Sequence, residues 1–330
     1  FIPQLIGDYS PCTYLLRQEK YMVMLPKRQE VIMTLNLIKS LEAENSLRGK
    51  MVYLPHTNKS IAKAQNNGWI VNNTTAAHIA NGIEKLNSQY LDGSLIKKVI
   101  IKSNSKLDGI PTIGFPNIFI QSTFMRLYYN NFDRMNKLPA CRILMDYFKE
   151  HKCCMNCSRC SGLCYNNKFE AQYPQKAISE LRILLAYITD RPALSAKIIR
   201  VAKRSKSGYF RINQNGEIHS EEMLCMWTYI ALKCPSIEFY TYTKSYELFE
   251  EHLKNNDLPA NFHVNMSVLE GQEDRLSKFE RLYAGNKFKM VTKIEEGSHN
   301  VCTGNCSTCG RLCMQDLPKD DNTILCLYHN

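Results

Sequence analysis

The sequence has no long hydrophobic run, since no apolar stretch reaches about 18 residues, the minimum for a membrane-spanning helix. Residues 1–8 have neither a basic start nor a long apolar centre, so they do not resemble a secretory signal peptide. Low-complexity tracts are also absent, which confines the expected disorder to chain ends and loops. No glycine-rich dinucleotide fingerprint follows any expected strand. We therefore expect a folded protein with no membrane partner, and the missing fingerprint argues against a doubly wound sheet.

Cysteine, in contrast, is abundant, with 14 residues in a chain of 330. Most lie in two motifs, the upstream cysteine motif (Cys153, Cys154, Cys157, Cys160 and Cys164) and the C-terminal cysteine motif (Cys302, Cys306, Cys309 and Cys313). Disulfide scaffolds spread cysteines over small secreted chains, whereas this chain is 44% hydrophobic and long enough for a core of its own. The pattern predicts a cytoplasmic protein whose thiols bind metal. The isolated Cys225 and Cys234 are expected to be core thiols.

The spacing within the motifs favours iron–sulfur clusters. Cys302-x3-Cys306-x2-Cys309 has the spacing of radical S-adenosylmethionine enzymes, and Cys313 lies near enough to close the site as a fourth ligand. Cys157-x2-Cys160-x3-Cys164 has the reverse order, and Cys153 or Cys154 would supply its fourth thiolate. We expect one or two [4Fe–4S] clusters, with S-adenosylmethionine as a cofactor if one iron stays open. Structural zinc is the alternative, although zinc ribbons usually pair two Cys-x2-Cys knuckles.

The pattern of apolar residues divides the chain in two. Residues 1–103 predict a mainly helical N-terminal domain, because apolar positions recur at three- and four-residue steps over 27–44 and 76–90. Residues 95–102 are rich in β-branched side chains and predict a short strand. Residues 104–330 predict a cysteine-cluster (β/α) domain.

In that second domain, strands and helices alternate. We expect strands at 209–214, 237–243, 262–268 and 288–293, with helices at 221–232, 244–253 and 272–283 between them. Connections of this length favour parallel strands. The sequence therefore predicts an α/β fold with a partial (β/α) barrel of parallel strands and cysteine-rich loops, in preference to a doubly wound sheet.

Function in such folds collects where the strands end. Glu217 follows the first strand and Lys244 the second, so we assign catalytic roles to both, with Glu217 handling a proton and Lys244 an anionic substrate group. His219 lies beside Glu217 and is either its acid/base partner or a solvated loop residue. The formal charge of +11 and a basic helix at 194–204 make nucleic acid a candidate partner.

Several stretches together resemble one family. These are residues 104–116, the Cys-x3-Cys-Tyr motif at 160–165, Tyr173-Pro174, residues 209–217, Trp227, Phe-Tyr-Thr-Tyr-Thr-Lys-Ser at 239–245, and the C-terminal cysteine motif. Over about residues 104–313 the chain is similar to the bacteriophage "gene product 88" family. It departs from the family pattern at Asn213, Asn215 and Glu217, where His, Ser and Asp are usual. The resemblance implies a phage-encoded cysteine-cluster protein, in the host cytosol, and implies no specific activity.

Three hypotheses follow. The first is an iron–sulfur protein related in style to radical enzymes, acting on nucleic acid. The second is a non-enzymatic module in which zinc or iron–sulfur centres hold the loops and basic residues bind nucleic acid. The third is a phage accessory protein that grips a host protein through residues 1–103. The sequence leaves open whether the protein is an enzyme.

Overall fold

A curled parallel sheet and its surrounding helices make up the part of the chain that the computed structural model describes, namely residues 73–153, 174–268, 273–291, 293–306, 308–315 and 317–327. The sheet strands are β1 (Tyr209–Arg211), β2 (Glu238–Thr243), β3 (Phe262–Val268), β4 (Lys287–Val291), β5 (Val301–Cys302) and β6 (Thr323–Leu327). Their order is β1-β2-β3-β4-β6-β5, and every neighbouring pair is parallel. The sheet forms a half-barrel, which confirms the expected mixed α/β fold with a partial barrel.

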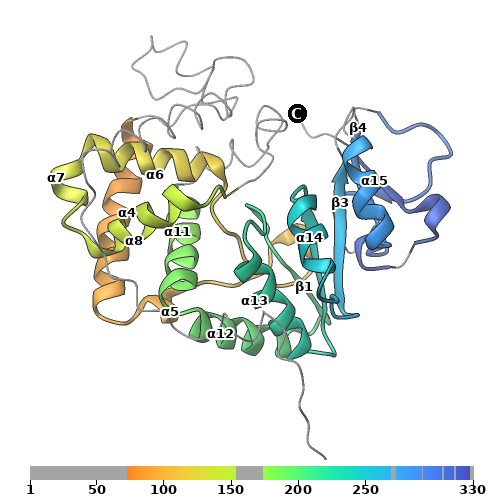
Figure 1. Cartoon of the computed structure of the whole chain (residues 1–330), viewed down its shortest axis with the longest axis horizontal. Helices are drawn as coiled ribbons and strands as arrows, with labels where there is room; N and C mark the ends of the chain where they lie inside the picture. Colours follow the sequence, from red (N-terminus) through yellow and green to blue (C-terminus); the bar gives the residue numbers. More distant parts are fainter. Residues whose placement is uncertain are drawn as a thin grey trace, which may run out of the picture.

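The first four strands are joined by crossover helices, as the alternating pattern predicts. These are α13 (Glu221–Leu232), α14 (Tyr246–Leu253) and α15 (Glu273–Leu282). Helix α13 begins where Ser220 caps it, because the Ser220 hydroxyl accepts a hydrogen bond from the backbone N–H of Met223 at 3.2 Å. Its apolar face, with Trp227 fully buried, packs against Phe210 of β1. Figure 1 shows α13, α14 and α15 beside the strands that they connect.

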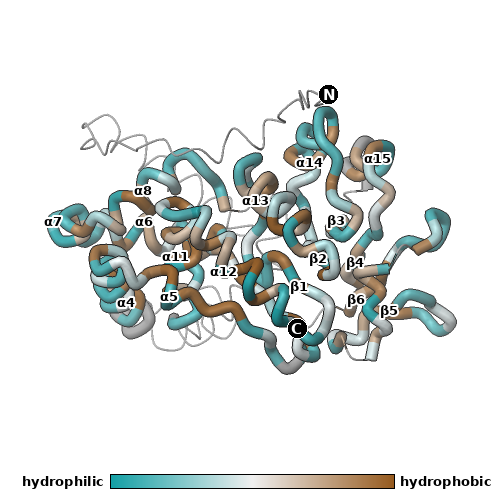
Figure 2. The backbone as a smooth tube through the Cα atoms, turned by 90° about the horizontal axis from the view of Figure 1, so that it is seen from below, coloured by the Kyte–Doolittle hydropathy of each residue, from teal (hydrophilic) through white to brown (hydrophobic). Residues whose placement is uncertain are grey.

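Two strands and one sheet extension lie outside the sequence-based expectation. Strands β5 and β6 come from the chain end, after the fourth expected strand, and add to the far edge of the sheet (Figure 2). At the opposite edge, Thr112 forms an isolated parallel bridge with Arg211. The backbone N–H of Arg211 donates to the Pro111 carbonyl at 3.0 Å, and that of Gln214 to the Ile113 carbonyl at 2.8 Å. Residues 111–115 therefore continue the sheet beyond β1.

A second group of helices packs beside the sheet. It contains α4 (Asn73–Leu91), α5 (Leu95–Lys98), α6 (Ile118–Asn130), α7 (Phe132–Met135), α8 (Pro139–Glu150), α11 (Pro174–Thr189) and α12 (Arg191–Lys203). Figure 1 shows α4, α6, α8 and α11 gathered on the side away from β3 and β4. Buried residues of α4, α8 and α11 belong to the same large core as the sheet residues Phe239 and Val264. The hydrophobic effect therefore joins helices and sheet in one body.

The segment at 95–102 corrects the sequence-based expectation, because its first four residues form the short helix α5 and not a strand. Leu95 and Val99, four residues apart, are both buried, and this spacing brings two side chains onto one side of a helical turn. The Lys197 ammonium donates to the Ile96 carbonyl at 2.7 Å and to the Lys97 carbonyl at 3.1 Å. A cation on the last carbonyls stabilises the end of so short a helix.

The two faces of the sheet carry different residues. Phe239, Val264 and Met266 point to the crossover helices and lie in the large core. Alternate residues form the inner face, where Tyr240 and Ile324 lie in a smaller core with Leu107, Ile110 and Cys313. The 3-10 turns η1 (Ser105–Leu107) and η3 (Leu312–Met314) bring these last residues to it, and η4 (Lys319–Asp321) leads into β6. The inner face of the half-barrel is thus covered by the chain's own C-terminal segment.

The described part of residues 1–103 is helical, as expected, but α4 and α5 share the large core with later helices. The division at residue 103 stays a prediction, since residues 1–72 lie outside the described residues. None of the helices in the described ranges is long and apolar enough to cross a membrane.

Candidate metal-binding site

Five cysteines, none of them in a disulfide, gather at the inner face, and we call them the C-terminal thiol site: Cys302, Cys306, Cys309, Cys313 and Cys326. Cys302 ends β5 and is the register partner of Cys326 on β6. Cys306 and Cys309 lie in the loop that follows β5, and Cys313 lies in η3. The backbone N–H of Cys306 donates to the Lys106 carbonyl at 2.9 Å, which fixes this loop to η1. The four residues of the C-terminal cysteine motif are therefore brought together, with a fifth from β6.

Tyrosine hydroxyls from β2 face these sulfurs. The Tyr242 hydroxyl donates to the Cys313 sulfur at 2.8 Å. The Tyr240 hydroxyl is close enough to Cys306 for each group to affect the pKa of the other, yet it is buried and has no hydrogen-bond partner. The Arg211 guanidinium lies over the Tyr242 ring, 5.2 Å from its centroid. The site therefore has a cation, one donor engaged with sulfur and a second donor left without an acceptor.

Burial and mutual repulsion both oppose ionisation of the thiols. Burial, with neighbouring Cys302 and Cys309, raises the pKa of the Cys313 thiol to about 12, against the lowering effects of Tyr242 and Arg211. Burial also raises the pKa of Cys306, with Cys309 adding to the effect. Interaction with the Cys302 sulfur is the largest cause that raises the pKa of Cys326, ahead of burial. Crowded thiols of this kind become thiolates when a metal cation supplies the positive charge.

The residues present fit a sulfur-ligated metal centre. All the donors are thiols, the ligands that zinc and iron–sulfur clusters select, and the unpaired Tyr240 hydroxyl is a donor that a metal-bound sulfur would accept. One tetrahedral zinc with Zn–S bonds of about 2.3 Å holds its sulfurs about 3.8 Å apart. Among the described residues, no three of these thiols come within 4.8 Å of one another. The thiol donors suit zinc and iron–sulfur clusters alike.

The upstream cysteine motif enters the described residues only at Cys153. Its backbone N–H donates to the Gln121 side-chain oxygen at 2.9 Å, and the Gln121 amide donates to the carbonyls of Phe148 and His151 at 3.0 and 2.8 Å. Burial raises the pKa of the Cys153 thiol. Cys154, Cys157, Cys160 and Cys164 lie outside the described residues, so a metal site there stays a prediction.

Glu217 and Lys244 lie together, as the sequence suggested, but through the Lys244 backbone. The Glu217 carboxylate accepts hydrogen bonds from the Lys244 backbone N–H at 3.1 and 3.2 Å and from the Ser245 hydroxyl at 2.5 Å. Ser245 precedes α14, so the carboxylate anchors the start of this helix to the loop after β1. Glu217 is 8% exposed. This geometry gives Glu217 a structural task, and the catalytic roles of both residues stay predictions.

His219 is buried and not solvated, and it does not pair with the Glu217 carboxylate. Its Nδ1 lies 3.0 Å from the Glu217 backbone carbonyl, and its Nε2 lies 2.8 Å from the Tyr147 hydroxyl. The carbonyl can only accept, so Nδ1 carries the proton and Nε2 accepts from Tyr147. Burial lowers the pKa of His219 to about 4. His151 stacks on Tyr147 with ring centroids 4.1 Å apart.

A buried carboxyl group lies next to the loop after β1. Glu180 of α11 is 3% exposed, and burial raises its pKa to about 8 against the effects of Lys176 and Asn215. The Asn215 amide donates to Glu180 Oε1 at 2.6 Å, and the Lys176 ammonium lies 3.8 Å from that oxygen. Burial therefore favours the protonated form of Glu180. Sequence reasoning missed it, because a single glutamate on a helix carries no signal of burial.

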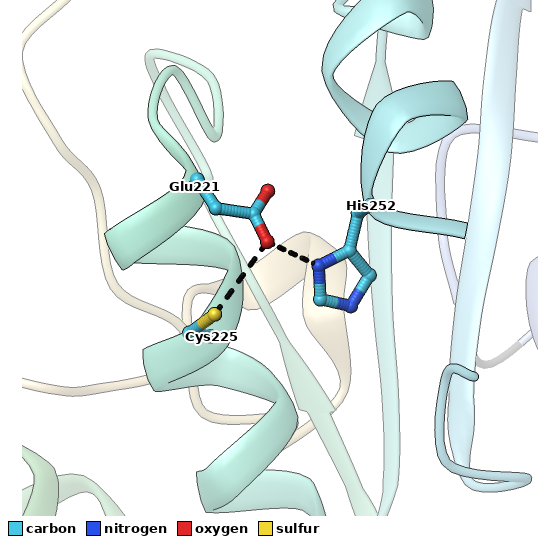
Figure 3. Close-up of side chains that lie close together, drawn as sticks. All are labelled: Glu221, Cys225 and His252. Atoms are coloured by element: carbon cyan, nitrogen blue, oxygen red, sulfur yellow. Dashed lines mark hydrogen bonds and ion pairs between the residues drawn. The ribbon is translucent and has the colours of Figure 1, made fainter. Parts of the chain in front are cut away.

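A second group of metal-type ligands lies between α13 and α14, and Figure 3 shows it. His252 Nδ1 lies 2.6 Å from Glu221 Oε1, and the Cys225 sulfur lies 3.6 Å from the same oxygen. The Cys225 sulfur is part of a disulfide, which corrects the expectation of a core thiol. A disulfide sulfur has no proton to donate and no thiolate charge, so its approach to Glu221 is a contact. With two ligands left, this group makes a weak metal site.

The C-terminal thiol site contains residues that the sequence did not single out. Cys326 lies 13 positions beyond Cys313 in the sequence, outside the C-terminal cysteine motif, and only strand pairing brings it to Cys302. Tyr240 and Tyr242 carry a usable signal, since strand alternation places both on the face opposite Phe239. Arg211 follows Phe210 on β1, so strand alternation likewise places its side chain on the face opposite the large core.

Comparison with known proteins gives one match. The family model described as Gene product 88 matches residues 122–292. No curated protein and no solved structure gave a significant match. The matched region begins within α6, includes β1 to β4 with their crossover helices, and ends before the C-terminal thiol site. Because the match spans more than half of the sequence, the chain belongs to the Gene product 88 family, a family of phage gene products.

Proposed function

We propose that this phage protein carries an iron–sulfur cluster at the C-terminal thiol site, held by Cys302, Cys306, Cys309 and Cys313. The observation that supports it most is the gathering of free thiols against the inner face of the half-barrel. When bound by all four cysteines, such a cluster supplies electron transfer; if Cys313 is not a ligand, one iron is open for a substrate or S-adenosylmethionine. Tyr242 would orient the Cys313 sulfur through its hydrogen bond, and Arg211 would offset the negative charge of the thiolates.

Purification without oxygen tests the proposal. We expect a brown protein with absorbance near roughly 400 nm, the usual thiolate-to-iron band, and iron with inorganic sulfide in equal amounts. Cys306→Ser and Cys309→Ser are expected to lose most of this iron. Cys141→Ser is the control, since Cys141 is also a thiol outside any disulfide but lies in α8, away from the site. A colourless protein with one zinc bound through the same cysteines would replace the iron–sulfur proposal with the zinc alternative.

The proposal includes a second cluster, bound by the upstream cysteine motif. A count of iron per chain near eight, against about four, separates two [4Fe–4S] clusters from one. Cys157→Ser combined with intact C-terminal cysteines is expected to halve the iron. The radical-enzyme version has its own test, which is reductive cleavage of S-adenosylmethionine by the loaded protein. Failure of that cleavage would leave the cluster as an electron carrier or a structural centre.

A basic surface supports nucleic acid as a partner. It consists of Lys97 and Lys98 of α5, Arg200, Lys203 and Arg204 at the end of α12, and Lys206. All six side chains are exposed, and none forms a salt bridge with another described residue. Helices α5 and α12 contact each other, so the cations lie on neighbouring elements. Such a surface fits the phosphate backbone and carries no sequence preference by itself.

Binding of a short DNA duplex or RNA, measured by fluorescence anisotropy over a salt series, tests this surface. We expect affinity to fall steeply with salt, and the Lys203→Glu/Arg204→Glu variant to weaken binding by about tenfold or more. Lys85→Glu, an exposed lysine on α4, is the control and should have little effect. Equal losses in the two variants would show that binding follows net charge alone. The gripping of a host protein through residues 1–103 stays a further proposal, testable by deleting residues 1–72.

A further inference from the structure

Cys302 and Cys326 are paired more closely than the rest of the thiol site. They are direct register partners on the neighbouring parallel strands β5 and β6. Parallel neighbours lie about 4.8 Å apart and point paired side chains to the same face. The Cα separation in disulfides is usually about 4.4–6.8 Å, so the backbone already meets the main geometric requirement. Neither cysteine is in a disulfide, and both residues are partly exposed.

The surroundings also favour reaction between these two thiols. The Cys302 and Cys326 side chains are close enough to each other for a hydrogen bond between the two sulfurs. Strand β5 contains only two residues and lies at the sheet edge, where Gly304 with a φ of 76° turns the chain away. A short edge strand can move by a fraction of an ångström more easily than a central strand. The remaining thiols Cys306, Cys309 and Cys313 have no register partner of this kind, because none lies on a strand.

We propose that Cys302 and Cys326 form a reversible disulfide with a peroxide as oxidant, and that this bond withdraws Cys302 from metal binding. The Cys302 thiolate attacks one peroxide oxygen, the O–O bond breaks, and the leaving hydroxide takes a proton to become water. The resulting sulfenic acid is attacked by the Cys326 sulfur, so the S–S bond forms and the S–OH bond breaks, releasing a second water. Each sulfur loses one electron, and the peroxide takes both.

The proposal rests on the proposed function only where it concerns metal release, since the disulfide needs no metal. A bridge between two partly exposed residues is accessible to reductants and easier to reduce than a buried one. The thiol site would then bind its cluster under reducing conditions and be closed to it after oxidation. Cys326 is not one of the four proposed ligands. In this reaction it is the resolving thiol, which attacks the sulfenic acid of Cys302.

The test uses the full chain, stripped of metal, reduced, and treated with one equivalent of hydrogen peroxide. Trypsin then separates Cys302, in peptide 294–311, from Cys326, in peptide 320–330. We expect mass spectrometry to find these two peptides joined, with fragmentation placing the bond at Cys302, and dithiothreitol to separate them. Cys326→Ser should abolish the joined species, whereas Cys313→Ser should retain it.

Loading with iron and sulfide before the peroxide separates the two proposals. If the wild-type chain holds a cluster, we expect the joined peptides to decrease at least fivefold, because Cys302 is then occupied. If the Cys302–Cys326 disulfide forms in a chain that never binds metal, the proposed function is refuted and the disulfide inference is supported. Conversely, a metal-binding chain whose stripped form gives no joined peptides, or joins them through Cys306 or Cys309, would overturn the inference.

Discussion

At the scale of single residues, the half-barrel gives ordinary side chains special surroundings. Tyr240 and Tyr242 lie two positions apart on β2, so their side chains point to the same face of the sheet, toward the thiols. Phe239 points to the opposite face and lies in the large core. One hydroxyl is engaged by Cys313 and the other has no partner. Hydrogen bonds to metal-bound sulfur stabilise added negative charge, so they raise the reduction potential of a cluster.

Tyr242→Phe should therefore keep the cluster and shift its midpoint potential to more negative values by tens of millivolts. Redox titration followed by electron paramagnetic resonance measures the shift. Tyr209→Phe is the matched control, since Tyr209 packs in the same small core and its hydroxyl has no bond to a thiol. An unchanged potential in Tyr242→Phe would mean that Cys313 is not a ligand.

Glu180 gives a pH-dependent prediction. Its folded-state pKa of about 8 lies above the ordinary value of 4.5, so the folded protein keeps a proton that the unfolded chain releases. Stability is therefore lost as pH rises between these two values, by at most about 1.4 kcal/mol for each pH unit. Glu180→Gln removes this loss, because a neutral amide does not titrate.

Urea unfolding between pH 5 and pH 9 measures this effect. The difference in unfolding free energy between Glu180→Gln and the wild type should increase with pH and level off above about pH 8. Glu296→Gln, an exposed glutamate, is the control and should show no such trend. A constant difference at all pH values would indicate that Glu180 is ionised throughout, as a strong Lys176 pair would allow.

At the scale of elements, the loop after β1 is the most constrained connection. Gly216 has a φ of 67°, and a Cβ there would lie 2.7 Å from the Phe115 carbonyl oxygen and 2.8 Å from that of Pro116. Both contacts are with backbone carbonyl oxygens at the end of the sheet extension, which cannot move away as a flexible side chain would. Asn213 in the same loop also has a positive φ, 53°, and its amide is 5% exposed with no hydrogen-bond partner. Strain of this kind often marks functional loops.

Gly216→Ala should thus destabilise the protein by about 2–4 kcal/mol, through the φ and the two close contacts together. Gly208→Ala is the matched control, since its φ is 74° and a Cβ would meet nothing within 4 Å. It should cost only about 1 kcal/mol. Urea or thermal unfolding measures both variants, and equal losses would show that the contacts at Gly216 relax at no cost.

The elements also show how far sequence reasoning reaches. Helix α13 and strand β3 were predicted at their observed bounds, because each has a strong period and, in α13, a serine cap. Helix α5 was predicted as a strand, because β-branched residues were counted while the burial of Leu95 and Val99 came from packing. Strand β5 was missed because two residues carry too little pattern, and β6 because no expected helix precedes it as one does β2 to β4. Cys326 was missed with them.

At the scale of the whole molecule, two cores of unequal size lie on opposite faces of one sheet. The large core joins the helices to the outer face, while the small core holds η1 and η3 against the inner face. The small core contains few buried apolar side chains, and one of them is Cys313. Hydrophobic burial alone therefore stabilises the C-terminal segment weakly, and a metal centre would supply what the small core lacks.

Hydrogen exchange with and without metal tests this division. Stripping the metal should increase exchange by tenfold or more in residues 301–315 and 323–327, while α11 and α13 keep their protection, because the large core is untouched. Cys306→Ser should show the same local change without a chelator, and Cys234→Ser, a buried free thiol at the end of α13, should not. Loss of protection in α11 as well would mean that both cores unfold as one unit, and that the thiol site stabilises the entire fold.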